Sequence, residues 1–411
     1  MRQIKLSILL CLLVFGAANC GKSLEQIDSS GPAVSNANPS GNILRGRVGD
    51  FNADVDYFPD KTSFQYARQL KLEYRGNYKI VTFTPNVKGD ILRYVLVQRG
   101  TKVPDLPEMK DPLTRVFEVP LERIAMGSMR YGGATDLLDV VDQVNLVSGL
   151  KAITTQSILD RIKDGRILEQ YSSELLMERK VDAAMAYYSN SGESLTMQKD
   201  LELGINRVAM AEHLEESPLG RSEWIKFFAL FFNREKTANE KFGDIEKRYL
   251  ETAEKVRLKL IDVKYRPKVL VNYNRGDSWP VYGGKNGFAR LVEDAGGDYL
   301  FKDLPYRHSN FDMPLEAVYD KGSEADVWIV SPDFSSTFAD GKPRFDERLK
   351  KLKANDALFV TFNPTTGNRN PWWDGGLIHP DEELMDYVKI LHPELMPDHK
   401  LRFLRKINTE Q

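Results

Sequence analysis

Residues 218–260 read PLGRSEWIKFFALFFNREKTANEKFGDIEKRYLETAEKVRLKL and contain no strand pattern. In the second half of this stretch, apolar residues recur at steps of three or four, the spacing of one helix face. These positions are Ala238, Phe242, Ile245, Tyr249, Ala253, Val256 and Leu260. A helix over 234–260 is therefore predicted, and about 26 helical residues would be roughly 39 Å long. Such a length suits a strut between two domains.

The first half of the stretch contains Trp224–Phe232, WIKFFALFF, which is apolar on nearly every side. A helix that is hydrophobic all round is typically buried in a protein core. The alternative is insertion into a membrane, but a membrane span needs roughly 20 apolar residues and this run is much shorter. We therefore expect a core helix that leads into the strut.

Short apolar strands alternate with helical segments on both sides of the strut. Before it, the strand candidates are 123–128, 181–187 and 205–211; after it, they are 268–273, 325–332 and 357–363. Helical segments are expected at 135–144, 287–295, 314–321 and 381–391. This alternation indicates mainly parallel sheets with helices on both faces. The predicted fold class is α/β, with two Rossmann-like lobes (116–233 and 261–405) joined by the long helix 234–260.

Residues 51–115 form a β-rich extension ahead of the first lobe. The segments LKLEY (70–74), YKIVTFT (78–84) and ILRYVLVQRG (91–100) are separated by turn signals at 75–77 and 88–90. Residues 20–50 are rich in Ser, Asn, Gly and Pro, a composition that is typical of a flexible tether.

The first 19 residues resemble a secretory leader. Arg2 and Lys5 precede the apolar run Leu6–Ala18, which is too short to span a bilayer. The run ends in Ala-Ala-Asn-Cys, similar to the processing site of bacterial lipoproteins, although Asn19 replaces the usual small residue. By this resemblance Cys20 becomes the lipidated N-terminus of an exported, membrane-anchored protein. The alternative is an ordinary signal peptide with an incidental cysteine.

Charge and cysteine content exclude several classes of function. Lys and Arg number 57 and Asp and Glu 59, which gives a net charge of −2 and no basic excess for binding nucleic acid. Cys11 and Cys20 are the two cysteines of the sequence, and both lie near its start. The body of the chain therefore has no thiolate nucleophile, disulfide framework or cysteine-based metal site.

Seven segments in order carry a family resemblance: 119–128 (VPLERIAMGS), 136–150 (DLLDVVDQVNLVSGL), 173–187 (SELLMERKVDAAMAY), 212–242, 283–301, 314–330 and 372–395. Together they resemble the helix-linked periplasmic substrate-binding proteins of ABC importers, which bind ferric siderophores, haem and vitamin B12. The resemblance covers roughly residues 116–400. It implies a non-enzymatic receptor that holds its ligand between two lobes and delivers it to an ABC permease and ATPase. No cofactor is implied.

The resemblance places ligand contacts on loops that follow the strands. The candidates are Arg130, Tyr131, Tyr188, Tyr273, Arg275, Trp279 and Trp373. Tyr and Trp offer flat apolar faces, and Arg can pair with carboxylates or stack on rings. The alternative for each aromatic residue is a packing role that anchors its loop.

The family also docks on its permease through one glutamate from each lobe. By alignment these are Glu174 and Glu316. Opposite charges on exposed surfaces steer encounter and set orientation. The alternative is that both are ordinary carboxylates favoured at helix starts.

Enzymatic functions find little support in the motifs. The five histidines lack the HExxH spacing of a helical metal pair, and there is no phosphate loop or GxSxG. His213 is expected to position its loop. A tetrapyrrole metal chelatase, which would need a shielded His/Glu metal site, is one alternative function. An adhesin or sensor lipoprotein with the same fold is another. We predict no catalytic residue and no resident metal.

Overall fold

The computed structural model describes residues 33–34, 39–86, 89–149, 152–188, 199–200, 202–274, 276–305, 311–330, 346–355, 357–360 and 371–406. The leader, Cys20 and Arg275 lie outside these residues. No helix within the described part of the chain has the length and apolar character needed to cross a membrane.

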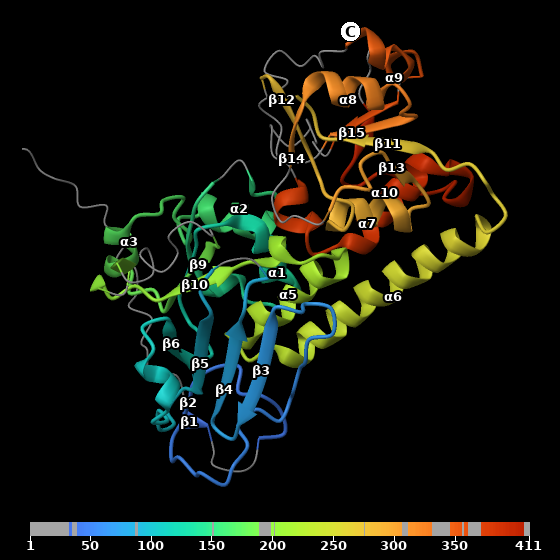
Figure 1. Cartoon of the computed structure of the whole chain (residues 1–411). Helices are drawn as coiled ribbons and strands as arrows, with labels where there is room; N and C mark the ends of the chain where they lie inside the picture. Colours follow the sequence, from blue (N-terminus) through green and yellow to red (C-terminus); the bar gives the residue numbers. More distant parts are fainter. Residues whose placement is uncertain are drawn as a thin grey trace, which may run out of the picture.

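The chain forms two α/β lobes joined by one long helix, with a β-sheet beneath the first lobe (Figure 1). The sheet of the first lobe has the order β10-β9-β7-β8 and is entirely parallel. Its strands are β7 (Ile124–Met126), β8 (Val144–Val147), β9 (Ala183–Tyr187) and β10 (Arg207–Met210). Its helices are α1 (Gly132–Leu137), α2 (Gln156–Lys163) and α3 (Ser173–Glu178).

The second lobe has a five-stranded sheet of order β13-β11-β15-β16-β17, parallel except for β17. Its strands are β11 (Lys268–Val271), β13 (Asp298–Tyr299), β15 (Val327–Val330), β16 (Leu358–Val360) and β17 (Arg405–Lys406). An antiparallel pair, β12 (Ser278–Val281) with β14 (Phe311–Pro314), lies beside it. The helices are α7 (Gly287–Asp294), α8 (Leu315–Gly322), α9 (Lys350–Ala354) and α10 (Pro380–Leu391). The predicted fold class is confirmed.

Helices α5 (Pro218–Leu230) and α6 (Glu235–Lys259) correspond to the stretch that predicted the strut. Ser217 caps α5 by accepting a hydrogen bond from the Gly220 N–H, and Pro218 occupies the first turn, where no N–H is needed. Asn233, with φ of 57°, makes the corner between the two helices. Asn adopts this left-handed conformation more readily than most residues, so the chain turns here without glycine.

The extension packs on α5 and shares a core with the first lobe. Its sheet has the order β3-β4-β5-β6 and comprises β3 (Leu70–Arg75), β4 (Tyr78–Phe83), β5 (Leu92–Gln98) and β6 (Thr114–Val119). Tyr94 and Phe117 from this sheet meet Phe231 of the corner edge-on at 5.9 and 5.4 Å, while Tyr131 of the lobe stacks on Phe228 at 5.9 Å. The all-round apolar helix is therefore covered from both sides.

The extension reaches further along the chain than its turn signals indicate. Strand β6 pairs in parallel with β5 and runs to Val119, beyond the expected boundary at 115. A parallel partner needs a crossover, here residues 99–113, so the sequence offers no hairpin signal for it. The two-residue strands β1 (Ala33–Val34) and β2 (Arg47–Val48) form a further parallel pair.

A fully buried ion pair joins the extension to the start of α6. Lys79 of β4 bonds Glu235, and neither side chain is exposed to solvent. Asn233 accepts a second hydrogen bond from the Lys79 ammonium at 3.0 Å, and Asn42 donates to Glu235 at 2.8 Å. Burial lowers the pKa of Lys79, and the carboxylate of Glu235 opposes that shift. Paired and hydrogen-bonded in this way, both charges are compensated.

Candidate functional site

The two lobes meet where the one-turn helix Met129–Tyr131 and the start of α1 pack against the turn Trp372–Gly376 of the second lobe. Gly133 allows this approach, because a Cβ at this position would lie 2.4 Å from the carbonyl oxygen of Asp374. No other residue could therefore keep the backbones this close.

Asp374 is a buried carboxylate that holds the lobes together at this junction. It accepts hydrogen bonds from the backbone N–H groups of Thr154 and Thr155, at 2.6 and 2.7 Å. It also accepts from both threonine hydroxyls. These threonines immediately precede α2, so the second lobe caps a helix of the first. Burial raises the pKa of Asp374, and the four hydrogen bonds oppose that rise.

Arg130 lies between aromatic rings of the two lobes. Its guanidinium carbon is 4.9 Å from the ring centroid of Tyr187 in the first lobe and 4.8 Å from that of Trp373 in the second. The ring of Tyr187 stacks in turn on His213, with centroids 4.4 Å apart. Planar cations and rings attract one another in this geometry. We call His213, Tyr187, Arg130 and Trp373 the junction stack.

The charge of Arg130 is balanced by Glu212, which is fully buried and lies 3.1 Å from the guanidinium. Glu212 precedes His213 in the segment EHLEES that follows β10. The remaining donors of Arg130 are not committed to a second carboxylate among the described residues. Arg130 side-chain exposure is 19%, so the stack lies close to solvent.

Behind the turn Trp372–Gly376, polar groups are buried around a small cavity of about 20 Å³. The indole N–H of Trp372 donates to Glu383 at 2.8 Å, and Arg221 lies over the ring of Phe288. Burial raises the pKa of Glu383 to about 7. The cavity has the size of a single water molecule and leaves no room for a ligand, so it supports the turn.

Some of the predicted ligand-contact residues lie at the junction between the lobes, and others lie in the core of one lobe. Arg130 and Trp373 come together in the junction stack. Tyr131 and Tyr188 are buried in the core of the first lobe. Trp279 is buried in the second lobe, where its indole N–H donates to the Val271 carbonyl.

Tyr273 of the second lobe is also buried, and Arg275 lies outside the described residues. The ligand-contact roles of the buried aromatics stay predictions, and we base no site on them. Each occupies the packing position that was the alternative for an aromatic loop residue.

Tyr187 belongs to the stack, although the neighbouring Tyr188 was the candidate from sequence. The two follow one another at the end of β9, where successive side chains point to opposite faces. Tyr187 is 42% exposed and Tyr188 is 1% exposed. Strand β9 is buried on both faces as far as Ala186, so the apolar pattern of the sequence does not separate the two tyrosines.

Glu174 and Glu316 lie on exposed helix starts in different lobes, at α3 and α8 (Figure 1). The backbone N–H of Glu174 and the hydroxyl of Ser172 hold the pKa of the Glu174 carboxyl below its usual value. Glu316 accepts a hydrogen bond from Arg348 at 2.6 Å. Their role in docking stays a prediction.

One group of possible metal ligands occurs within the described ranges: His379, Asp381 and Glu382, at the start of α10. Arg248 donates to Asp381 at 2.7 Å, and Arg402 pairs with Glu382. Both carboxylates are therefore already balanced by cations. Burial lowers the pKa of His379 to about 4. We therefore assign the group to the structural support of α10.

Removing the Asp374 carboxylate should weaken the junction between the lobes. Asp374→Ala leaves two helix-start N–H groups without their acceptor, and we expect a loss of about 2–4 kcal/mol in unfolding free energy. Hydrogen exchange at Thr154 and Thr155 should accelerate as well. Asp142→Ala is the matched control, since Asp142 pairs with Arg161 of α2 but is 61% exposed. Equal, small losses in both variants by chemical denaturation would contradict the assignment.

Comparison with known proteins finds relatives that are named lipoproteins. No family model matches it. The uncharacterized lipoprotein MJ0878 of Methanocaldococcus jannaschii is 31% identical over 315 residues, which are 72% of this chain and 71% of the relative. The uncharacterized lipoprotein MJ0872 of the same organism is 25% identical over 332 residues, covering 77% of this chain and 80% of the relative.

Among solved structures, a periplasmic binding protein from Veillonella parvula aligns with a TM-score of 0.51 at 13% identity. The alignment covers 77% of this chain and 99% of the other. This likeness establishes the fold: two lobes connected by a long helix, as in a periplasmic binding protein.

Proposed function

The chain belongs to the same family as the lipoprotein MJ0878, and on that premise we propose that it is a membrane-anchored solute-binding protein of an ABC importer. Its ligand is a ferric siderophore or a related metal complex such as haem or cobalamin. It binds this ligand between the lobes and delivers it to the permease without chemical change. The export leader and Cys20, as the lipidated residue, provide the attachment to the membrane.

The observation that carries the proposal is the junction stack. It combines a cation with rings of both lobes at one place, so a ligand there contacts both lobes at once. Arg130 supplies charge for carboxylate or catecholate oxygens, and Tyr187 and Trp373 supply flat apolar faces. Metal complexes of siderophores and tetrapyrroles combine these two features.

The connection between the lobes favours a small closing motion. Helix α6 packs against α5 and α10, and Asp374 bonds the first lobe directly. A ligand shifts the lobes only by its differential affinity for the closed arrangement. We therefore expect closure by a few degrees about this junction, with Trp373 moving relative to Tyr187.

Replacing the cation of the stack should weaken ligand binding. We expect Arg130→Ala to lower the affinity for the cognate complex at least about tenfold, because a charge-assisted hydrogen bond contributes about 1.5–3 kcal/mol. Arg166→Ala is the matched control, an exposed arginine of the same lobe that pairs with Asp164. Tryptophan fluorescence titrations with a ferric siderophore, haem and cobalamin measure the effect. Equal affinities in both variants would exclude Arg130 from the site.

A further inference from the structure

The C-terminal end of α6 and the turn after it expose apolar side chains to an unusual degree. Among the described large hydrophobic residues, the four most exposed are Ile261 (67%), Tyr265 (60%), Leu258 (53%) and Leu250 (46%). Val263 adds another at 44%. All five lie within residues 250–265. Exposed apolar side chains gathered in one place mark an interaction surface, whereas single ones do not.

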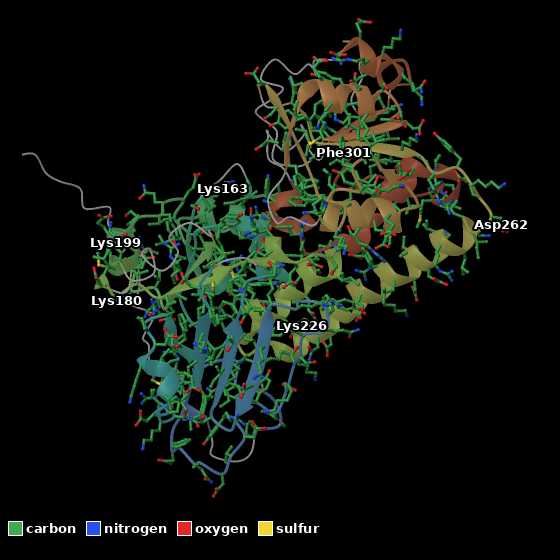
Figure 2. The ribbon with its side chains drawn as sticks, in the orientation of Figure 1. Lys163, Lys180, Lys199, Lys226, Asp262 and Phe301 are labelled. Carbon is green, nitrogen blue, oxygen red and sulfur yellow. The ribbon has the colours of Figure 1, made fainter. Side chains whose placement is uncertain are left out.

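The same segment is cationic on a chain that is slightly acidic overall. Residues 250–268 contain six Lys or Arg and three Asp or Glu, a net charge of +3, against −2 for the whole sequence. Lys259 and Lys264 are exposed and form no ion pair with any described residue. Asp262 lies at the outer end of α6 in Figure 2, with the cations on either side of it in sequence. We call residues 257–266 the α6 tip.

An open groove of about 730 Å³ adjoins the α6 tip. Lys264, Tyr265 and Arg266 line it from the tip, and Lys268 and Lys302 line it from the second lobe. The acidic residues of the groove are Glu293, Asp298 and Asp303, and Asp298 is already paired with Lys302 at 2.6 Å. Lys268 is likewise paired with Glu324, and Arg266 donates to the Leu260 carbonyl. Among the described residues, the groove cations without a carboxylate partner are therefore Lys264 and Arg266, next to the exposed apolar groups of the tip.

We propose that the α6 tip rests on an anionic lipid surface. Ile261, Leu258 and Tyr265 enter the headgroup region, and Lys259, Lys264 and Arg266 bind lipid phosphates, with the groove accepting headgroups beside them. Long basic side chains and tyrosine occupy this interfacial layer in membrane proteins because each has an apolar body and a polar end. Two copies of the tip would repel one another through their like charges, so a lipid surface suits it better than self-association. The inference concerns a surface apart from the junction stack and does not depend on which ligand binds there.

Vesicle flotation tests this directly with residues 20–411 carrying Cys20→Ser. This chain keeps every described residue and has no lipid anchor. Vesicles contain phosphatidylcholine alone or with about 30% phosphatidylglycerol, since each basic residue near an anionic surface contributes about 1 kcal/mol. We expect the protein to float with the anionic vesicles only, and to be released in high salt.

Variants locate the contact. Lys264→Gln, which removes one charge, and Ile261→Ser, which removes apolar area, should each lower partitioning about fivefold. Two controls should leave partitioning unchanged: Lys163→Gln, at the end of α2, and Val103→Ser, which removes a single exposed apolar side chain (43%) of the extension. Figure 2 shows Lys163 far from Asp262 on the molecule.

Three results would overturn the proposal. The first is no flotation with anionic vesicles. The second is equal flotation with neutral vesicles, which would leave the basic residues without a role. The third is self-association of the free protein that disappears in Ile261→Ser, which would make the tip an interface between copies.

Discussion

Lys79→Met should destabilise the protein by about 3–5 kcal/mol, the usual cost of leaving a buried charge without its partner. The variant leaves the buried carboxylate of Glu235 without its cation, although it keeps the hydrogen bond from Asn42. Since Lys79 belongs to the extension and Glu235 begins α6, the loss should appear as weaker docking of β3–β6 on the helices. Chemical denaturation followed by circular dichroism gives the free energy of unfolding.

The matched variant removes both charges. Lys79→Met combined with Glu235→Leu replaces the pair with apolar side chains, and such replacements are often neutral or stabilising. We expect the double variant to recover most of the stability lost in Lys79→Met. If the double variant were as unstable as the sum of the two single variants, the pair would not be energetically coupled.

Glu174→Ala combined with Glu316→Ala should abolish ligand uptake by cells and leave ligand affinity intact. Both carboxylates are exposed and lie on different lobes. The fit of a partner that contacts both therefore depends on the relative position of the lobes. Glu316 can exchange its partner at little cost. Arg348 also pairs with Asp320 at 3.0 Å and with Asp346 at 2.8 Å. It would keep these two ion pairs if Glu316 bound a permease arginine instead.

The control for docking removes two other exposed glutamates that pair with arginines. Glu118 lies on the extension and pairs with Arg99; Glu293 lies on α7 and pairs with Arg290. Glu118→Ala combined with Glu293→Ala should transport normally. Normal uptake in the Glu174/Glu316 variant, measured with the labelled ligand in cells that contain only that variant, would remove the docking assignment.

The sequence predicts the helices and the lobes well because their signals are local. The periodic apolar face of α6 and the continuous apolar run of α5 each indicate one structure, and the observed helix Glu235–Lys259 ends within one residue of the expected 234–260. The boundary of the extension was harder to predict, because β6 pairs in parallel with a strand some 15 residues earlier and no turn marks such a pairing.

The site was predictable only in part, because it depends on contacts between distant segments. Arg130 and Trp373 were candidates from their loops, but their contact joins positions more than 200 residues apart. Lys79 shares a strand face with Val81 and Phe83, a position where a lysine is normally unexpected, and nothing local identifies Glu235 as its partner. The carboxylate of Asp374 likewise caps a helix of the other lobe.

Hydrogen exchange of the protein with and without ligand tests the central claim most directly. With a ferric siderophore, haem or cobalamin at saturation, we predict slower exchange in residues 127–131 and 211–215 of the first lobe and in 371–376 of the second. Strands β3–β6 should be unchanged. Slowing confined to one lobe, or no change with any of the three ligands, would contradict a solute site between the lobes.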